Sequence, residues 1–312
     1  MAVMALPDQP WPTGDVERPE PLVARVLAPN ASPFTYTGTQ TYLVGSEDGL
    51  AVIDPGPDDK QHIAALLAAI GDAEIVAIMC THTHRDHSPA AAPLAEATGA
   101  PIVGCGPLVI NTDEPRLDAA FDRTYAPDRV LADGESVSAP GWTLTAIATP
   151  GHTSNHLCFA LEESGAVFTG DHVMGWSTSI IVPPDGDMGH YLESLALLYE
   201  RKQDKVYYPA HGPAVTKPHQ LVRSTLGHRR AREKQIGKLL AGGVPAKAGT
   251  SRSKSQRSQP SLGLTIEDLV PVMYKGLDER MWPAAGLSVK AHLLDMERRG
   301  IVSRSGDIWQ TI

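Results

Sequence analysis

The sequence predicts a layered α/β protein that ends in a small unit of two helices and a hairpin. Three observations predict this class. Short apolar runs alternate with segments of helical periodicity over residues 39–104. A block of apolar runs separated by turn residues follows over residues 129–170. Helical spacing over residues 265–299 then precedes two short strand-like runs, which is the order of a winged helix.

The first half of the chain alternates strands and helices. Residues 1–35 are polar and rich in proline, and they predict an arm laid over the surface. The polar turn after residue 45 and the spacing of the apolar residues place the next elements. Strands are expected over residues 39–45, 50–56, 74–80 and 101–104, with helices over residues 57–70 and 88–98.

The second half adds a β-rich block and further helices. Residues 106–128 show no clear period and are expected to form a loop, with a short helix, that borders a site. The expected strands cover residues 129–131, 136–138, 142–148, 156–161, 166–170 and 205–209. The expected helices cover residues 188–201 and 218–240, and the end of the second would be the first helix of the winged-helix unit.

The chain of 312 residues predicts one large and one small domain. Residues 242–261 are nearly free of large apolar residues and predict a flexible linker or insert. The Thr265/Asp268 spacing indicates a capping box, and Pro271 predicts a kink or an early stop in the helix that follows. The expected division is an arm over 1–35, a large domain over 36–241, the linker, and a winged-helix domain over 262–312.

Composition restricts the environment and the partners. A hydrophobic fraction of 42% without any run long enough to span a bilayer excludes a membrane protein. The first residues lack the features of a secretion signal, and three scattered cysteines indicate buried thiols, so we expect a cytoplasmic protein. The net charge is −9, yet residues 217–260 alone carry +10. That basic segment indicates either nucleic-acid binding or simply a solvated helix and linker.

The richest chemical motif is Thr81-His82-Thr83-His84-Arg85-Asp86-His87, directly after the apolar run 74–80. Imidazole and carboxylate groups are ligands for zinc and similar divalent ions. His82, His84 and His87 do not share one helical face at these spacings, so the motif predicts a loop at a strand end.

Three further ligand-type positions also follow expected strands. His152 stands in Pro-Gly-His-Thr after the run 142–148, Asp171 in Gly-Asp-His after 166–170, and His211 in Ala-His-Gly after 205–209. A glycine beside each turn allows the backbone to approach a neighbour closely. Each position is a weak signal alone, and their repeated placement favours a role as metal ligands.

Taken in order, Thr-His-x-His-x-Asp-His, Gly-His-Thr, Gly-Asp-His and Ala-His-Gly resemble the motifs of the metallo-β-lactamase superfamily over about residues 20–240. The resemblance implies a four-layer αββα sandwich with two metal ions at one edge. It implies that the first ion binds His82, His84 and His152. The second would bind Asp86, His87 and His211, and Asp171 would bridge the two.

A site of this kind implies hydrolysis by a metal-bridging hydroxide, because two divalent ions outweigh the two aspartates and favour an anionic transition state. Asp86 could orient that hydroxide and is the expected catalytic residue. Other residues could position ligands or contact substrate: Asp54, His156, His172 and Thr178.

The aspartate at position 171 resembles the hydrolase side of the superfamily, and residues 262–312 resemble the winged helix of its lactamase-β-like, endoribonuclease branch. We therefore expect a phosphodiester or an ester or thioester substrate, either RNA or a small molecule. One alternative is a glyoxalase II-like thioesterase, and another is a winged-helix nucleic-acid-binding protein with a non-catalytic metal centre. Zinc is the default ion, and Mn or Fe also suit the donors.

Overall fold

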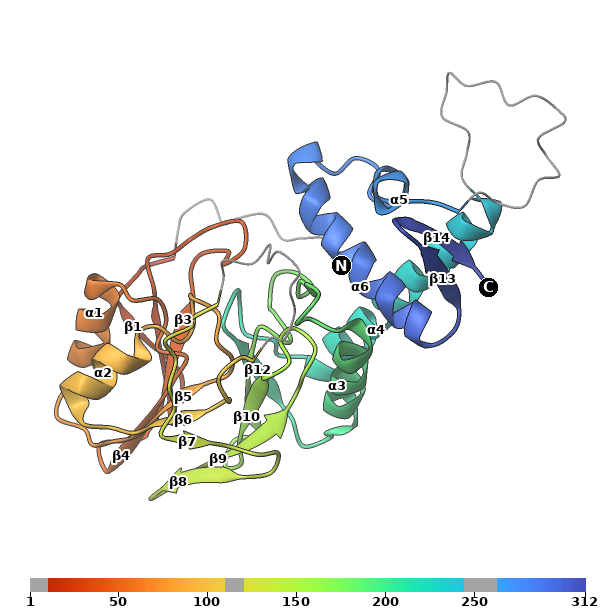
Figure 1. The fold of residues 1–312 in the computed structure, drawn as a ribbon. Helices are drawn as coiled ribbons and strands as arrows, with labels where there is room; N and C mark the ends of the chain where they lie inside the picture. The colour runs from red at the N-terminus through yellow and green to blue at the C-terminus, as the bar shows by residue number, and fades with distance from the viewer. Residues whose placement is uncertain (1–10, 110–120, 244–262) are drawn as a thin grey trace, which may run out of the picture.

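The computed structural model describes residues 11–109, 121–243 and 263–312. Two β-sheets face each other, and helices cover the outer face of each, which gives the expected αββα order of layers (Figure 1). A smaller C-terminal unit of helices and a hairpin lies beside α3 and α4 (Figure 1).

The first sheet has seven strands in the order β1 to β7. Neighbouring strands are antiparallel from β1 to β4 and parallel from β4 to β7. Its strands are β1 (Val16–Glu20), β2 (Val23–Leu27), β3 (Gln40–Ser46), β4 (Gly49–Ile53), β5 (Ile75–Cys80), β6 (Ile102–Gly104) and β7 (Arg129–Val130).

The expectation of a surface arm over residues 1–35 is wrong for residues 16–27, which form β1 and β2. Strand β2 pairs with β3, and Val23 and Val26 are fully buried. This apolar run is only five residues long and lies between proline-rich flanks, so its local pattern is weak. Burial against β3 decides its structure.

The second sheet has five strands in the order β12-β11-β10-β9-β8. Both faces of its central strand are buried, because Leu157 and Phe159 join the core between the sheets while Cys158 and Ala160 pack beneath the outer helices. Its strands are β8 (Ser136–Ala139), β9 (Trp142–Ala148), β10 (Leu157–Leu161), β11 (Ala166–Gly170) and β12 (Val206–Pro209).

Two helices cover each sheet on its outer side. Helices α1 (Lys60–Ile70) and α2 (Ala91–Thr98) pack on the first sheet, and α3 (Met188–Glu200) and α4 (Pro218–Lys238) pack on the second. The Asp59 and Asp187 side chains cap the N-termini of α1 and α3 by accepting hydrogen bonds from backbone N–H groups.

The C-terminal unit begins within α4. The last turn of that helix and the π-type turn η1 (Leu239–Gly243) bury Ile236 and Leu240 in one core with Leu269 and Trp309. The expected capping box at Thr265 is present, but Pro271 does not end the helix. The remaining elements are α5 (Ile266–Met273), η3 (Glu279–Met281), α6 (Trp282–Arg298), β13 (Val302–Ser305) and β14 (Ile308–Thr311).

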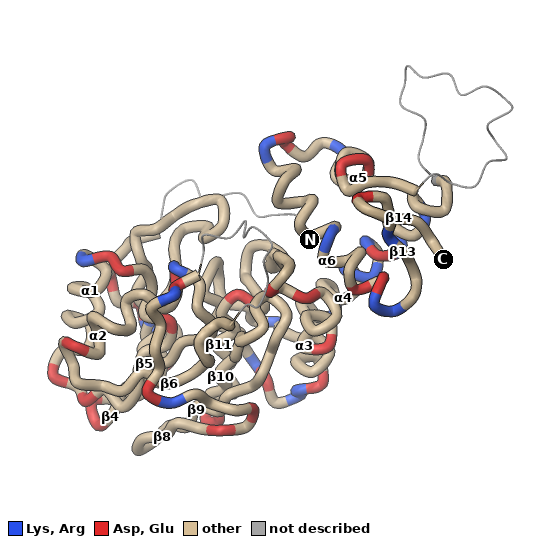
Figure 2. Tube along the Cα trace, viewed as in Figure 1, with Lys and Arg blue, Asp and Glu red and all other residues tan. Residues whose placement is uncertain are grey.

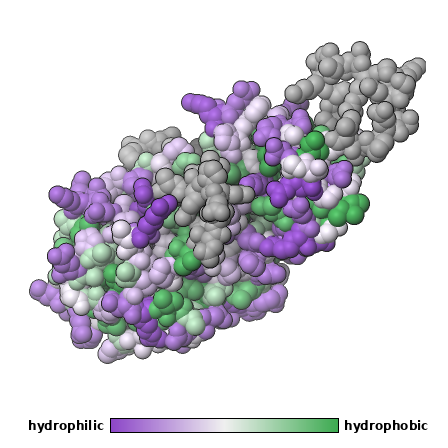
Figure 3. Space-filling model, viewed as in Figure 1, coloured by the Kyte–Doolittle hydropathy of each residue, from purple (hydrophilic) through white to green (hydrophobic). Residues whose placement is uncertain are grey.

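The expected linker over 242–261 falls almost entirely outside the described residues. Among the described residues, the helices are all too short or too polar to cross a membrane. The face shown in Figure 3 carries mainly hydrophilic residues with smaller hydrophobic patches between them. Cys80, Cys105 and Cys158 are free and buried, as expected from their apolar surroundings.

Candidate metal centre

The predicted ligands all follow the C-terminal ends of strands at one edge of the sandwich. His82, His84, Asp86 and His87 follow β5. His152, Asp171 and His211 follow β9, β11 and β12. The structure brings all seven side chains together in two adjacent groups, and the potential ligand atoms within each group lie within 4.8 Å of one another.

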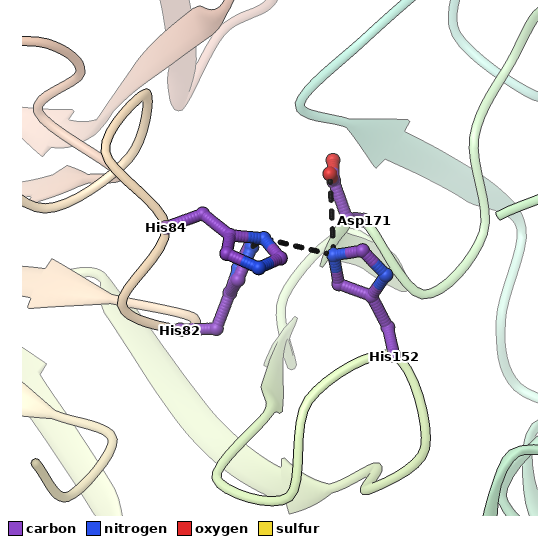
Figure 4. Close-up of side chains that lie close together, drawn as sticks. All are labelled: His82, His84, His152 and Asp171. Atoms are coloured by element: carbon purple, nitrogen blue, oxygen red, sulfur yellow. Dashed lines mark hydrogen bonds and ion pairs between the residues drawn. The ribbon is translucent and has the colours of Figure 1, made fainter. Parts of the chain in front are cut away.

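The first group contains His82, His84, His152 and Asp171 (Figure 4). The Nδ1 atom of His84 lies 2.9 Å from Nε2 of His82 and 3.1 Å from Nε2 of His152. Oδ2 of Asp171 lies 3.5 Å from the same His152 nitrogen. Three imidazole nitrogens and one carboxylate oxygen therefore converge on one point.

The second group contains Asp86, His87 and His211. Nε2 of His211 lies 3.1 Å from Oδ2 of Asp86 and 3.3 Å from Oδ1 of Asp171. Nε2 of His87 lies 3.5 Å and 3.6 Å from the same two oxygens. Asp171 thus directs one carboxylate oxygen to each group.

Asp54, directly after β4, supports ligands of both groups through hydrogen bonds. Its carboxylate accepts hydrogen bonds from the Thr81 backbone N–H at 2.7 Å, the Thr81 hydroxyl at 2.8 Å and Nδ1 of His87 at 2.9 Å. The Thr81 hydroxyl in turn accepts from Nδ1 of His82 at 3.0 Å. Because an ionised carboxylate only accepts, both rings carry their proton on Nδ1 and present Nε2 to the site.

Backbone carbonyls fix two further rings. Nδ1 of His152 donates to the carbonyl oxygen of Ile180 at 2.8 Å, and Nδ1 of His211 donates to that of Gly38 at 3.2 Å. The Ser179 hydroxyl donates to the carbonyl oxygen of Asp171 at 2.5 Å. Sequence reasoning missed these supports, because a carbonyl that orients an imidazole leaves no signal in residue type.

Glycine is required in two of the ligand turns. Gly151 precedes His152 at a φ of 140°, where a Cβ atom would lie 2.3 Å from Cα of Tyr191. Gly170 precedes Asp171 at a φ of 48°, where a Cβ atom would lie 2.6 Å from Oγ1 of Thr81. Both turns can pass so close to their neighbours only without a side chain.

The two groups differ in their electrostatics. Burial and the neighbouring imidazoles hold the pKa of His82 well below its usual value and lower the pKa of His84 to about 3, so these rings are neutral donors. Burial also acts against a charged His87, but the carboxylates of Asp86 and Asp171 raise its pKa well above the usual value. The carboxylates of the second group therefore attract positive charge, which a bound cation would supply in place of a proton on Nε2 of His87.

The other expected site residues lie around these groups. His156 is buried, its Nδ1 lies 2.9 Å from the Thr149 hydroxyl, and its ring stacks on that of His82 at 5.1 Å. His172 is also buried, and its ring packs 4.8 Å from the Tyr191 ring. A supporting role or substrate contact for these two residues stays a prediction. Substrate contact by Thr178, which is half-buried, stays a prediction.

The segment expected to border the site does so at its described end. The Phe121 ring lies 4.6 Å from the ring of His84, and its carbonyl oxygen accepts a hydrogen bond from Arg85 at 3.3 Å. The Asp122 backbone N–H donates to the carbonyl oxygen of Thr83 at 2.8 Å. Residues 110–120 lie outside the described residues.

A family model described as the metallo-beta-lactamase superfamily matches residues 35–211, which is more than half of the chain. The chain belongs to the metallo-beta-lactamase superfamily. A second model, the beta-lactamase associated winged helix domain, matches residues 265–309. These matches confirm the expected fold class and make the chain a superfamily hydrolase with a C-terminal winged helix.

Curated relatives in this superfamily match almost the whole chain. A beta-lactamase-like protein 2 homolog from Drosophila melanogaster is 30% identical and covers 91% of each chain. An atrochrysone carboxyl ACP thioesterase from Aspergillus chevalieri is 34% identical, over 86% of this chain and 78% of its own.

Solved structures of the superfamily share the architecture of both domains. A beta-lactamase domain protein from Burkholderia ambifaria has a TM-score of 0.75 at 18% identity, over 98% of this chain and 96% of its own. A metallo-beta-lactamase family protein from Thermus thermophilus has a TM-score of 0.71 at 20% identity, over 94% of this chain and 99% of its own. At these identities the likeness supports the fold alone.

Proposed function

We propose that this chain is a dinuclear metal-dependent hydrolase. One observation carries the proposal: the two carboxylate oxygens of Asp171 face different groups, with Oδ2 beside His152 and Oδ1 beside His87 and His211. A carboxylate shared in this way is suited to bridge two cations. His82, His84 and His152 would hold the first ion, and Asp86, His87 and His211 the second.

The donors fit metal ions in number, type and spacing. Two ligands of a tetrahedral zinc ion at about 2.0–2.1 Å lie about 3.3 Å apart. The separations given above run from 2.9 to 3.6 Å, and all potential ligand atoms of each group lie within 4.8 Å of one another. Nε2 of His87 and Oδ1 of Asp171 are buried and have no hydrogen-bond partner among the residues that the structure describes, as expected of atoms that bind an ion. Zinc is the ion we propose first, and Mn or Fe would also suit this thiolate-free set.

Bound ions would supply Lewis acidity and lower the pKa of water in the cleft. The protein's own contribution begins with Asp86, whose side chain keeps 28% exposure while Oδ2 faces His211. Such a carboxylate can orient an attacking water and accept its proton. Asp54 and Thr81 keep Nε2 of His82 and His87 directed inward throughout.

We propose a thioester or ester as the substrate. The chain is similar to a relative named as an acyl carrier protein thioesterase over most of its length, and hydrolysis of a polarised carbonyl needs only the groups described above. This proposal includes the glyoxalase II-like alternative, which differs in the acyl and thiol parts of the substrate.

Phosphodiester hydrolysis, including endoribonuclease activity, is the second candidate because of the winged helix and the basic segment 217–260. Two arginines of that segment make contacts within the protein. Arg229 is buried, and Arg232 donates to the carbonyl oxygen of Met273. Lys and Arg around α4 and α6 are also interspersed with Asp and Glu (Figure 2). The described part of the segment is thus less suited to RNA than its sequence predicts.

A panel of S-lactoylglutathione, an acyl-pantetheine thioester, single-stranded RNA and nitrocefin tests the proposal. We expect wild-type protein to hydrolyse a thioester and the Asp86→Ala variant to lose that turnover while remaining folded. RNA cleavage alone would favour the second candidate. RNA binding with a steep salt dependence and no hydrolysis would favour a nucleic-acid-binding protein with a non-catalytic metal centre.

Two further assignments remain proposals. We place the domain boundary in the last turns of α4, because Ile236 and Leu240 join the core of the C-terminal unit. We include residues 16–27 with the catalytic sandwich, because β2 pairs with β3. We propose a cytoplasmic location, since three free cysteines suit a reducing compartment.

A further inference from the structure

One short stretch of backbone, formed by Ser179 and Ile180, touches both loops that complete the first group. The Ser179 hydroxyl shares its single proton between the carbonyl oxygens of Asp171, at 2.5 Å, and His172, at 2.9 Å. The Ile180 carbonyl oxygen accepts the Nδ1 proton of His152 at 2.8 Å. A shift of this stretch would therefore move His152 relative to His82, which stands on a different loop.

Arg229 of α4 holds the same stretch from the opposite side. Its side chain is buried, and Nη2 donates to the carbonyl oxygen of Ser179. Nη1 lies 3.4 Å from the Ser288 hydroxyl of α6, and the guanidinium lies 5.3 Å from the centre of the Tyr191 ring. Burial of a guanidinium is costly unless such partners are in place. The contact thus depends on how α4, α6 and α3 are packed.

A second arginine reaches the His152 turn by another route. Arg298 of α6 donates from both terminal nitrogens to the Asp187 carboxylate, at 2.6 and 2.8 Å. The Asp187 backbone N–H donates to the carbonyl oxygen of Gly151 at 2.9 Å, directly before His152. Two independent chains of contacts therefore connect the C-terminal helices to the turn that carries His152.

We propose that α4 positions His152 and Asp171 through Arg229, and that α6 of the winged-helix unit positions His152 through Arg298. Ion binding in the first group would then depend on how the winged-helix unit packs. The inference rests on the proposed dinuclear centre. His82 and His87 are held separately by Asp54, so loss of either arginine should lower the affinity for the first ion more than the affinity for the second.

Calorimetric titration of the full-length apoprotein with Zn²⁺ tests this control. Arg229→Gln removes the donor to Ser179, and we expect about a 10- to 100-fold weaker affinity for one of the two ions, the range typical of lost support to a metal ligand. Arg230→Gln is the matched control, because Arg230 lies on the same helix and is exposed. It should bind both ions as wild type does.

Arg298→Ala supplies a second arm with an exposed side chain, which keeps the test decisive if Arg229→Gln does not fold. We expect the affinity of Arg298→Ala for the same ion to fall by a smaller factor, of several-fold. Arg299→Ala should keep the wild-type affinity, because the partners of Arg299 are Glu233 and Asp295. Thermal unfolding of each apoprotein separates general destabilisation from this selective effect.

The possible outcomes distinguish failure of the dinuclear centre from failure of the positioning role. Absence of Zn²⁺ binding in wild type would overturn the dinuclear centre itself. If wild type binds two ions and folded Arg229→Gln binds both with unchanged affinity, the positioning role alone would be overturned. If Arg229→Gln does not fold, unchanged affinities in Arg298→Ala would have the same meaning. An equal loss in Arg230→Gln would also overturn it.

Discussion

Replacement of Asp54 by asparagine would reverse two hydrogen-bond chains without changing the size of the side chain. The amide oxygen of the new side chain can still accept from the Thr81 N–H, and asparagine tolerates the positive φ of 48° at this position. Its amide nitrogen would instead face two donors, the Thr81 hydroxyl and Nδ1 of His87. Both His87 and His82 would gain by moving their proton to Nε2, the atom directed at the ions.

The expected loss follows from those contacts. A charge-assisted hydrogen bond contributes about 1.5–3 kcal/mol, and support of a metal ligand typically accounts for about 10- to 100-fold in affinity. Asp54 contacts His87 directly and reaches His82 through Thr81. We therefore expect the affinity for each of the two ions to fall by that range.

Chelator competition with Zn²⁺ measures the two affinities in Asp54→Asn and in a matched control. Asp59→Asn makes the same change at the N-cap of α1, where the side-chain oxygen can still accept from the His62 N–H. The control should bind as wild type does. If Asp54→Asn also kept both affinities, the tautomer argument for His82 and His87 would be refuted.

Three further predictions concern stability. Gly151→Ala should lower the free energy of unfolding by about 1–3 kcal/mol for the strained backbone and by about 1–3 kcal/mol more for the clash with Tyr191. Urea titration should show a clearly larger loss of stability than for Gly141→Ala. At Gly141 φ is also positive, but no described atom lies within 4 Å of the new Cβ. Equal losses would contradict the close approach. Burial opposes ionisation of Asp187, but Arg298 holds its pKa at about 2, so the pair stabilises the fold above the unfolded pKa of about 3.9. After allowance for solvent screening, Arg298→Ala should cost about 1 kcal/mol at pH 7, and the difference from wild type should shrink as pH falls from about 4 towards 2; a difference that is constant with pH would contradict this linkage. Chelation of the ions should lower the melting temperature in calorimetry, because ligand at about 1,000 times its Kd stabilises the native state by about 4 kcal/mol, and Zn²⁺ should restore it; an unchanged melting temperature would argue against bound ions.

Local sequence pattern predicted most elements of the fold, because each long apolar run had a clear period. Helix α1 and strand β5 lie close to their expected bounds. The pattern failed where pairing decides, as in β2, whose five residues give little signal without β3 beside them. The αββα order was expected from the resemblance, since the order of strands in a sheet is not encoded in local periodicity.

The site was predictable to the extent that its chemistry lies in side-chain type. All seven expected ligands could be selected from the sequence, because imidazole and carboxylate groups are uncommon at strand ends. The structure brings their side chains together in two groups. The contacts that orient them were not predictable, since the Ile180 and Gly38 carbonyls could belong to any residue. Burial of Arg229 was equally hidden, because a basic helix pattern indicates a solvated face.

Elemental analysis of wild-type protein, purified without chelator and supplied with Zn²⁺, tests the central claim most directly. The arrangement of Asp171 between the two groups predicts about two ions per chain. A ratio near zero in folded protein would contradict the metal centre, and a ratio that stays at one in excess Zn²⁺ would contradict its dinuclear form.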